Sequence, residues 1–437
     1  KDKMNLSKSV YQVRRARLMD SLPNGAVVVL KTASLCTRNN DCEFEFRPNS
    51  DFFYLTGFPE PDAYVVITAT GKAHLFSLAK DPEKELWEGF RYGVEGAMET
   101  FGLDQVSPIS NLSHDLPLLL DAATSVYFAF ADTQLHSAVM TACTTLSGRV
   151  RAGAVAPAIL ANVTPVLAEM RLIKDAHEIE LMEKAAQISV LAHRKAMQTV
   201  RPGMMEYELE AELNYCFMKS GARQPAYSNI VAAGKNACTL HYIRNNAQIQ
   251  EGDLVLIDAG CELGCYASDI SRTFPANGKF SEPQAALYQV VLAAYYAGLA
   301  KLNIGEAYEA CHNAAVKVIT SGLVELGLLQ GEVDSLIESK AYRDFYMHNT
   351  GHWIGLDVHD AGLYQQEGKS RLLEAGMALT LEPGIYVSPH NLNVAPNWRG
   401  IGIRIEDDIV ITEQGPYVLT HGLAKEIADI EALMASK

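Results

Sequence analysis

The sequence lacks several features that would have decided its class. No apolar stretch reaches the roughly 18 uncharged residues that a membrane-spanning helix needs, and the longest candidate, residues 285–300, contains three tyrosines and a glutamine. Positive charge is in deficit, because the formal net charge is −15, which disfavours a protein that follows nucleic-acid phosphates. The first residues also lack the apolar run of a secretory signal. We therefore predict a cytoplasmic protein that binds neither membrane nor nucleic acid.

Cysteine is scarce and follows no pattern. The 437 residues contain eight cysteines, and none of them forms a CxxC pair. This spacing favours reduced, mostly buried thiols over a disulfide scaffold. Tandem repeats, low-complexity segments and long charge runs are absent as well. What remains is a chain long enough to form two or three domains with a sizeable core.

The hydrophobic pattern changes near residue 171. Before it, short apolar runs predict an α/β domain with a mixed sheet, in which residues 63–68 and 73–78 form a hairpin. After it, long amphipathic helices alternate with strands, which indicates a larger α+β domain. We place the domains at residues 1–171 and 172–437. Further strands are predicted at 26–30, 52–55, 125–130, 254–257, 378–381 and 403–411, and helices at 178–200, 205–219, 285–302, 305–327 and 331–340.

Histidine is concentrated in the second domain. Nine of the twelve histidines follow residue 171, and His348, His352 and His359 lie within one short segment. The spacing of His348 and His352 is that of a helical zinc-protease motif, but Asn349 replaces its glutamate and Gly351 disfavours a helix. A lone histidine is most often a surface or hydrogen-bonded core residue. Three of them beside glycines favour a functional site.

Four carboxylates are associated with apolar strands. Asp258 and Glu382 each follow one directly, and Asp269 comes eleven residues after Asp258. Glu406 alternates with isoleucines, so it should share a strand face with Arg404. Any one of these could be a solvated strand-end carboxylate. Four together indicate a shared site, because buried carboxylates without partners are costly.

Two divalent cations would neutralise these four negative charges. A donor set of carboxylate oxygens with one imidazole is typical of Mn²⁺ sites. Structural zinc sites are rich in thiolates instead. Two adjacent metals can share a water molecule, lower its pKa and polarise a carbonyl group. The pattern therefore predicts metal-assisted hydrolysis.

The same residues resemble a known family. In order and spacing, Asp258, Asp269, His352, Glu382 and Glu406 are similar to the five-ligand dinuclear site of the pita-bread metallopeptidases, family M24. That family includes methionine aminopeptidase, prolidase and aminopeptidase P, and the bacterial type of the last, the Xaa-Pro aminopeptidases, is most similar. Further resemblance lies in residues 49–58, 254–260, 268–274, 351–355, 381–384 and 402–408.

This resemblance implies a fold and a mechanism. The fold would be a creatinase-like α/β domain with a mixed sheet, followed by a pita-bread domain with a curved, mainly antiparallel sheet. Asp269 and Glu406 would bridge two Mn²⁺ ions, with Zn²⁺ or Co²⁺ as substitutes. His352 and Glu382 would complete the ligands of one ion, and Asp258 those of the other. A metal-bridging hydroxide would attack the peptide bond before a proline in second position, and Glu382 would carry the proton.

The resemblance also assigns residues to the substrate pocket. His359 would stabilise the tetrahedral intermediate, and His241 would contact the residues around the scissile bond. His348, Arg404 and Tyr386 are expected to bind substrate or to orient ligands.

Two further assignments concern the rim of the pocket and the assembly. Trp87 resembles a tryptophan that an adjacent subunit lends to the pocket, although ordinary packing is nearly as good an explanation. The resemblance also implies a homodimer or homotetramer. Lys369 and Arg371 are alternative candidates for a cation at the pocket rim.

Other functions remain open at this stage. The same ligands would serve a prolidase that is limited to Xaa-Pro dipeptides, with organophosphate hydrolysis as a side activity. A metal-free binding module on the same scaffold, or creatinase-like chemistry, is disfavoured because all five ligands are present together with His241 and His359.

Overall fold

The computed structural model describes residues 7–436. Its contacts divide the chain into two compact units, 1–171 and 172–437, with the division near the end of helix α7 (Thr164–Leu172). Within residues 7–436, no helix is long and apolar enough to cross a membrane.

A six-stranded sheet forms the centre of the first unit. Its strands are β1 (Ala26–Lys31), β4 (Tyr64–Ile67), β5 (Ala73–Ser77), β6 (Gln105–Pro108), β7 (Ser125–Phe128) and β8 (Ile159–Asn162). Their order is β6-β5-β4-β1-β7-β8; β1 pairs antiparallel to β4 but parallel to β7. This arrangement confirms the predicted mixed sheet and the β4–β5 hairpin. The helices of this unit are α1 (Lys8–Asp20), α2 (Ser50–Thr56), α3 (Pro82–Glu88), α4 (Gly93–Phe101), α5 (Leu112–Leu120) and α6 (Thr133–Gly148).

The strand predicted at residues 52–55 is wrong, because this segment is helix α2. Its four apolar residues are all buried, so burial does not distinguish helix from strand here. The residues at the two ends of the segment favour a helix. The side chain of Asn49 accepts the N–H of Phe52 at 3.0 Å as an N-cap, and Gly57 ends the helix with a left-handed φ of 65°.

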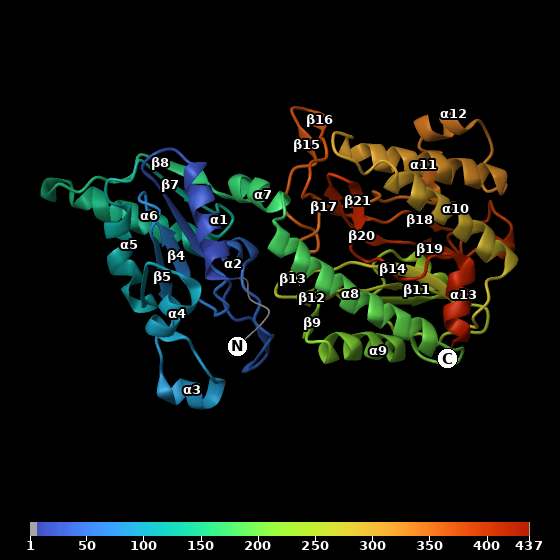
Figure 1. Cartoon of the computed structure of the whole chain (residues 1–437), viewed down its shortest axis with the longest axis horizontal. Helices are drawn as coiled ribbons and strands as arrows, with labels where there is room; N and C mark the ends of the chain where they lie inside the picture. The colour runs from blue at the N-terminus through green and yellow to red at the C-terminus, as the bar shows by residue number, and fades with distance from the viewer. Residues whose placement is uncertain (1–6, 437) are drawn as a thin grey trace. The chain divides into compact units, whose positions relative to one another are not determined.

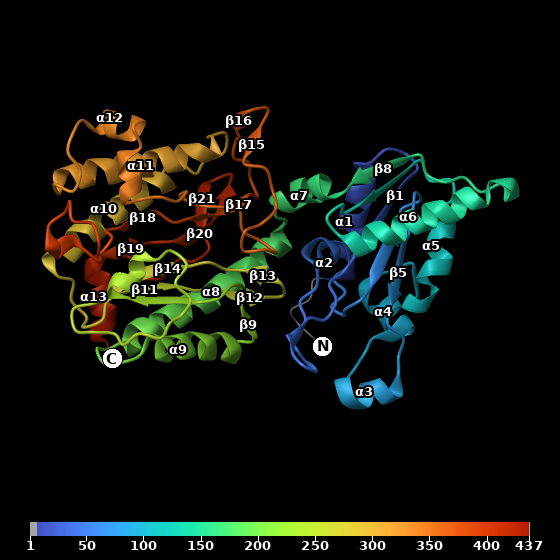
Figure 2. The same cartoon turned by 180° about the vertical axis from the view of Figure 1, so that it is seen from behind.

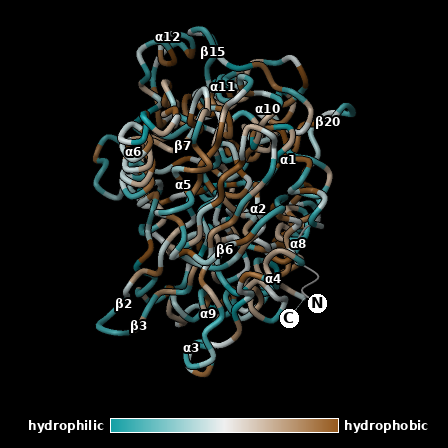
Figure 3. Tube along the Cα trace, turned by 90° about the vertical axis from the view of Figure 1, so that its left-hand side faces the viewer, coloured by the Kyte–Doolittle hydropathy of each residue, from teal (hydrophilic) through white to brown (hydrophobic). Residues whose placement is uncertain are grey.

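Two parts of the first unit expose their side chains. One is the hydrophilic hairpin of β2 (Thr37–Asn39) and β3 (Cys42–Glu43), visible in Figure 3. The other is α3, which has no buried residue and leaves Trp87 86% exposed.

Short antiparallel ladders make up the strand layer of the second unit. All pairings among its strands are antiparallel within the described residues, which confirms the predicted mainly antiparallel α+β fold. The strands are β9 (Gln224–Pro225), β10 (Ile230–Ala233), β11 (Leu254–Asp258), β12 (Cys261–Leu263), β13 (Tyr266–Ala267), β14 (Ser271–Pro275), β15 (Gln365–Gln366), β16 (Lys369–Ser370), β17 (Ala378–Leu381), β18 (Gly384–Tyr386), β19 (Gly402–Arg404), β20 (Asp407–Thr412) and β21 (Gly415–Val418).

Helices pack against this layer from two sides. They are α8 (Ala176–Thr199), α9 (Glu206–Lys219), α10 (Glu282–Leu299), α11 (Tyr308–Glu325), α12 (Val333–Glu338) and α13 (Ile427–Ala435). Figures 1 and 2 show α8 and α9 on one side of the strands and α10 and α11 on the other. The five helices predicted in this region correspond to α8–α12, and the capping box at Ser281 is present at the start of α10.

The predicted strand 403–411 is interrupted. Ile405 and Glu406 separate β19 from β20, and the two strands pair with different partners, β18 and β17. The register continues across the break, since Leu381 pairs with Asp407 and Gly384 with Arg404, so Glu406 lies between two ladders of one antiparallel run.

Candidate metal centre

Asp258 and Asp269 are held on neighbouring segments of the β11–β14 ladder. Asp258 ends β11 and pairs in register with Ser271, the first residue of β14, and Asp269 lies two residues before that strand. The hydroxyl of Tyr227 lies between the two carboxylates, 2.6 Å from Asp258 Oδ1 and in hydrogen-bond contact with Asp269 Oδ1. Both carboxylates therefore face the same space.

Two glycines allow the backbone to come this close. A Cβ on Gly260 would lie 1.7 Å from the carbonyl oxygen of Ser268, next to Asp269. A Cβ on Gly351 would lie 2.0 Å from the carbonyl oxygen of Thr380, beside the strand that precedes Glu382. Any side chain at either position would push apart the segments that carry Asp269, His352 and Glu382.

His352 presents one ring nitrogen to the carboxylates. Its Nδ1 lies 2.9 Å from the carbonyl oxygen of Trp353, an acceptor, so Nδ1 carries a proton and donates it. Nε2 then faces Asp269 Oδ2 at 3.5 Å and Glu382 Oε1 at 3.6 Å. This is the orientation in which a histidine offers Nε2 to a metal.

Glu406 reaches the cluster from the two-residue break between β19 and β20. Ser271 Oγ donates to its Oε2 at 2.6 Å, and Arg404 Nε donates to the same Ser271 Oγ at 2.9 Å. Arg404 also donates from Nη2 to Asp258 Oδ2 at 2.7 Å. One arginine thus orients the carboxylate of Asp258 directly and that of Glu406 through Ser271.

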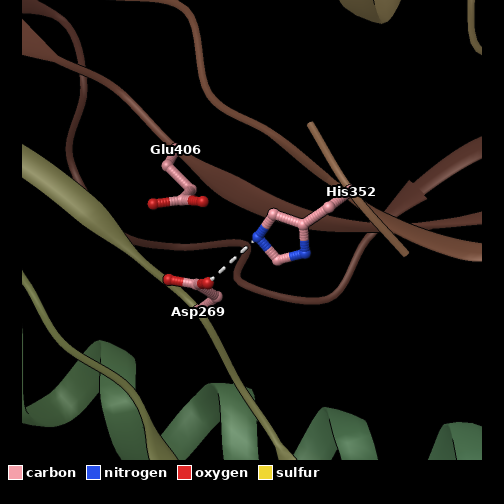
Figure 4. Close-up of side chains that lie close together, drawn as sticks. All are labelled: Asp269, His352 and Glu406. Atoms are coloured by element: carbon pink, nitrogen blue, oxygen red, sulfur yellow. Dashed lines mark ion pairs between the residues drawn. The ribbon is translucent and has the colours of Figure 1, made fainter. Parts of the chain in front are cut away.

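The five residues predicted as ligands all line one cavity of about 450 Å³. Donor atoms of Asp269, His352 and Glu406 lie within 4.8 Å of one another, and Figure 4 shows the three side chains pointing toward a common centre. Glu382 contacts this group because its Oε1 faces His352 Nε2. Asp258 is connected to it by the Tyr227 hydroxyl, which also contacts Asp269.

The charges of this cluster call for cations. Burial, together with the nearby carboxylates of Asp269, Glu382 and Asp258, raises the pKa of Glu406 well above its ordinary value. Burial opposes a charge on His352, yet Asp269 and Glu382 raise its pKa to about 9. This shift shows that negative charge is in excess around the imidazole. Divalent cations fit the same donor set, because they supply the positive charge that buried carboxylates need.

A chain of hydrogen bonds fixes His348 beside the ligands. Its Nδ1 donates to the carbonyl of Asn349 at 2.7 Å, so Nε2 accepts the hydroxyl of Tyr386 at 2.8 Å. That hydroxyl accepts in turn from Arg404 Nη1 at 2.9 Å. Burial and the charge of Arg404 lower the pKa of His348 to about 3, which keeps the imidazole neutral.

His241 and His359 also line the cavity. The rings of His359 and His352 meet edge to face with centroids 4.4 Å apart. Burial and the neighbouring His352 and His241 lower the pKa of His359, which leaves a neutral ring. Apolar side chains form much of the remaining wall: Ile230, Leu240, Ile243 and Val358.

Four predicted residues are not among those that line this cavity. Tyr386 is connected to it only through its hydrogen bonds with His348 and Arg404. Trp87 belongs to helix α3 of the first unit. Lys369 is exposed on β16, whereas Arg371 is buried and paired with Glu374 at 3.4 Å. Neither Lys369 nor Arg371 is among the residues that line the cavity.

Sequence reasoning missed Tyr227 and Ser271. Tyr227 lies between β9 and β10 in an irregular segment, so no periodicity marks it. Ser271 was noticed only as part of a motif, although its hydroxyl joins Arg404 to Glu406. No sequence signal marks this role, because the register that places Ser271 opposite Asp258 is seen only in the folded ladder.

Known proteins resemble this chain along its whole length. Residues 180–413 match the model of metallopeptidase family M24, and residues 11–127 match the aminopeptidase P N-terminal domain. The chain is 45% identical to the Xaa-Pro aminopeptidase of Haemophilus influenzae, over 98% of both sequences. It is 43% identical to that of Escherichia coli, over 99% of this chain and 98% of the relative.

Solved structures agree with these sequence matches. Pseudomonas aeruginosa aminopeptidase PepP gives a TM-score of 0.97 at 48% identity, with 99% of both chains covered. Zn-substituted Escherichia coli aminopeptidase P in complex with product gives 0.96 at 42% identity, with 99% of both chains covered. The family indicated by the sequence motifs is thereby confirmed. The chain belongs to metallopeptidase family M24 and carries an aminopeptidase P N-terminal domain before its metallopeptidase domain.

Proposed function

We propose that the chain is an Xaa-Pro aminopeptidase, which hydrolyses the bond between an N-terminal residue and a following proline. The observation that carries this proposal is the convergence of five metal-type donors with His241 and His359 in one cavity. The relatives named above as Xaa-Pro aminopeptidases support the same assignment.

Each donor has a task in this proposal. Asp258, Asp269, His352, Glu382 and Glu406 would hold two divalent ions, most favourably Mn²⁺, because four of the five residues offer hard oxygen atoms. When bound, such ions activate water and polarise the peptide carbonyl. Glu382 would also accept a proton from the attacking water and return it to the leaving nitrogen. In the metal-free chain, burial with Asp269 and Asp258 nearby raises its pKa to about 7.

Two histidines of the cavity would act on the substrate. His359, next to His352, can donate a hydrogen bond to an oxygen that gains negative charge during attack. His241 stands on the same cavity and would contact the residues that flank the scissile bond. The apolar wall would receive side chains of the peptide, including the ring of proline.

The decisive experiment is a cleavage assay on a tripeptide with proline in second position. A chelator is expected to abolish turnover and Mn²⁺ to restore it, whereas full activity of metal-stripped protein would refute the proposal. Glu382→Ala is expected to lose turnover by more than a hundredfold, because removing a group that acts in general acid–base catalysis costs about 10²–10⁴. Cleavage of the matching Xaa-Pro dipeptide, but not of the tripeptide, would favour a prolidase instead.

A further inference from the structure

The segment 234–247, which we call the His241 loop, forms one wall of the cavity. It starts with the 3-10 helix η3 (Gly234–Cys238), directly after β10, and contributes Leu240, His241 and Ile243 to the lining. His241 and Ile243 are exposed residues, so packing of their own side chains does not fix their positions. The loop must be held by other groups.

The carboxylate of Glu206 connects the two ends of this loop. Glu206 is the first residue of α9 and is 0% exposed. Its Oε1 accepts the N–H of Ala233 at 2.8 Å, and its Oε2 accepts the N–H of Ala247 at 2.9 Å. Ala233 immediately precedes the loop, and Ala247 is its last residue. One buried side chain therefore binds both ends.

The same carboxylate also reaches the middle of the loop. Tyr242, the residue after His241, donates its hydroxyl to Glu206 Oε2 at 2.8 Å. Asn236 Nδ2 donates to Glu206 Oε1 at 2.9 Å and lies 3.1 Å from the Tyr242 oxygen. Each carboxylate oxygen thus accepts two neutral donors, which is how a buried anion is satisfied by hydrogen bonds.

A second buried side chain fixes the returning part of the loop. Asn245 accepts the N–H of Val231 at 2.9 Å and donates from Nδ2 to the carbonyl of Asn229 at 2.9 Å, as a strand neighbour would do. Its φ of 47° is a conformation that asparagine tolerates better than most residues. The span between Asn236 and Asn245, which includes His241, is tied to Glu206 through Tyr242.

We propose that Glu206, through Tyr242 and the loop ends, is a positioning residue that holds His241 at the reacting bond. This inference rests on the proposed function, because it assigns His241 a contact with the peptide. Glu206 itself lies outside the cavity lining and acts only through the loop. If its hold is weakened, His241 spends less time in the productive position while the metal ligands keep their geometry. The main effect should then be a higher KM.

The test is a double-mutant cycle with Tyr242→Phe and His241→Ala. Tyr242→Phe removes one hydroxyl and is expected to lower kcat/KM by about tenfold, the usual scale for a hydrogen bond to a charged group, mainly through KM. In a His241→Ala background it should cost nothing further. Glu206→Gln is expected to act in the same direction, because it places an amide where a carboxylate oxygen now accepts donors.

The matched control is Tyr288→Phe, which removes a buried hydroxyl that donates to the carbonyl of Lys425 at 2.7 Å. It is expected to leave kcat/KM unchanged in both backgrounds. Additive losses from Tyr242→Phe and His241→Ala, or an unchanged kcat/KM in Tyr242→Phe, would overturn the proposal.

Amide hydrogen exchange separates this inference from the proposed function. Should the wild-type chain cleave no Xaa-Pro peptide, the proposed function fails, but the hold on the loop can still be measured. Tyr242→Phe is expected to speed exchange in residues 239–247 by about tenfold relative to Tyr288→Phe, because a lost hydrogen bond lowers the cost of local opening. Equal exchange in the two variants would overturn the positioning role whatever the activity.

Discussion

If the five residues form the proposed metal centre, protons must compete with metal ions for its carboxylates. Burial, with Asp269 and Asp258 nearby, raises the pKa of Glu382 to about 7, so below pH 7 this group is mostly protonated in the metal-free protein. Binding of Mn²⁺ requires the ionised form and must therefore release protons. Release is expected to be larger at pH 6 than at pH 8, and the apparent affinity should rise with pH between them.

Titration calorimetry in buffers of different ionisation enthalpy measures this release. The control is Glu382→Gln, which is expected to release about one proton fewer at pH 6 because it has no ionisable group at this position. Equal proton release at pH 6 and pH 8 would contradict the assignment of Glu382 to the metal centre.

Arg404 gives a second prediction at the residue scale. Its guanidinium bonds to Asp258, Ser271 and Tyr386 at once. A lysine ammonium lacks this planar fork, so Arg404→Lys should leave at least one ligand carboxylate poorly oriented. We expect Mn²⁺ affinity to fall by about 10–100-fold, the usual scale for groups that orient ligands. Arg399→Lys, at an arginine that bonds to the carbonyl of Val394, is the control and should bind Mn²⁺ normally.

Part of the site could be predicted from single residues, and the reason is energetic. A carboxylate directly after a buried strand, such as Asp258 or Glu382, needs a partner, and this need is visible in the sequence. The role of Tyr227 depends on its contacts with Asp258 and Asp269, which lie far from it in the sequence. The residues around Tyr227 show no hydrophobic periodicity that would mark it. Sequence patterns report burial and period, but they do not report which loop residue reaches a distant carboxylate.

At the scale of elements, the sequence was reliable where period and length agreed. Long amphipathic helices such as α8 and α10 were predicted to within a few residues, because many turns repeat the same signal. Short apolar runs carried too little information. Helix α2 is buried on every side, and the break at Glu406 lies inside an alternating run that reads as one strand.

The segment between Trp353 and Gly362, which carries His359, gives a prediction at this scale. Lys174 Nζ and Asp360 Oδ2 form an ion pair of 2.7 Å, with both side chains 1% exposed. Asp360 also accepts the N–H of Asp357 at 3.3 Å. Lys174→Met would leave a buried carboxylate without this cation. The free energy of unfolding is expected to fall by about 3–5 kcal/mol, the usual cost of breaking a buried pair.

Urea unfolding measures this loss, and two further variants test its origin. Lys174→Met combined with Asp360→Leu should recover part of the stability, because no unpaired charge remains. Lys184→Met removes an exposed pair with Glu180, 56% and 62% exposed, and should leave the free energy of unfolding nearly unchanged. A loss in Lys174→Met no larger than that in Lys184→Met would show that the buried pair does not support the segment.

At the scale of the whole molecule, bound metal is expected to stabilise the two units to different extents. Each has its own hydrophobic core, but every residue predicted as a ligand belongs to the second unit. A ligand that binds only the folded state stabilises the structure that contains its site. Mn²⁺ should therefore slow the opening of the segments that carry the carboxylates and His352.

Hydrogen exchange on the intact chain tests this expectation. Peptides from residues 254–275, 348–359 and 378–408 should exchange more slowly when Mn²⁺ is added, because opening these segments would release the metal. Peptides from β1 and β4 in the first unit provide the internal reference. Glu406→Gln should remove most of the Mn²⁺ effect while leaving those reference peptides unchanged, since its carboxylate is one of the converging donors. If Mn²⁺ slowed exchange only in the reference peptides, the metal would bind in the first unit and the proposed site would be wrong.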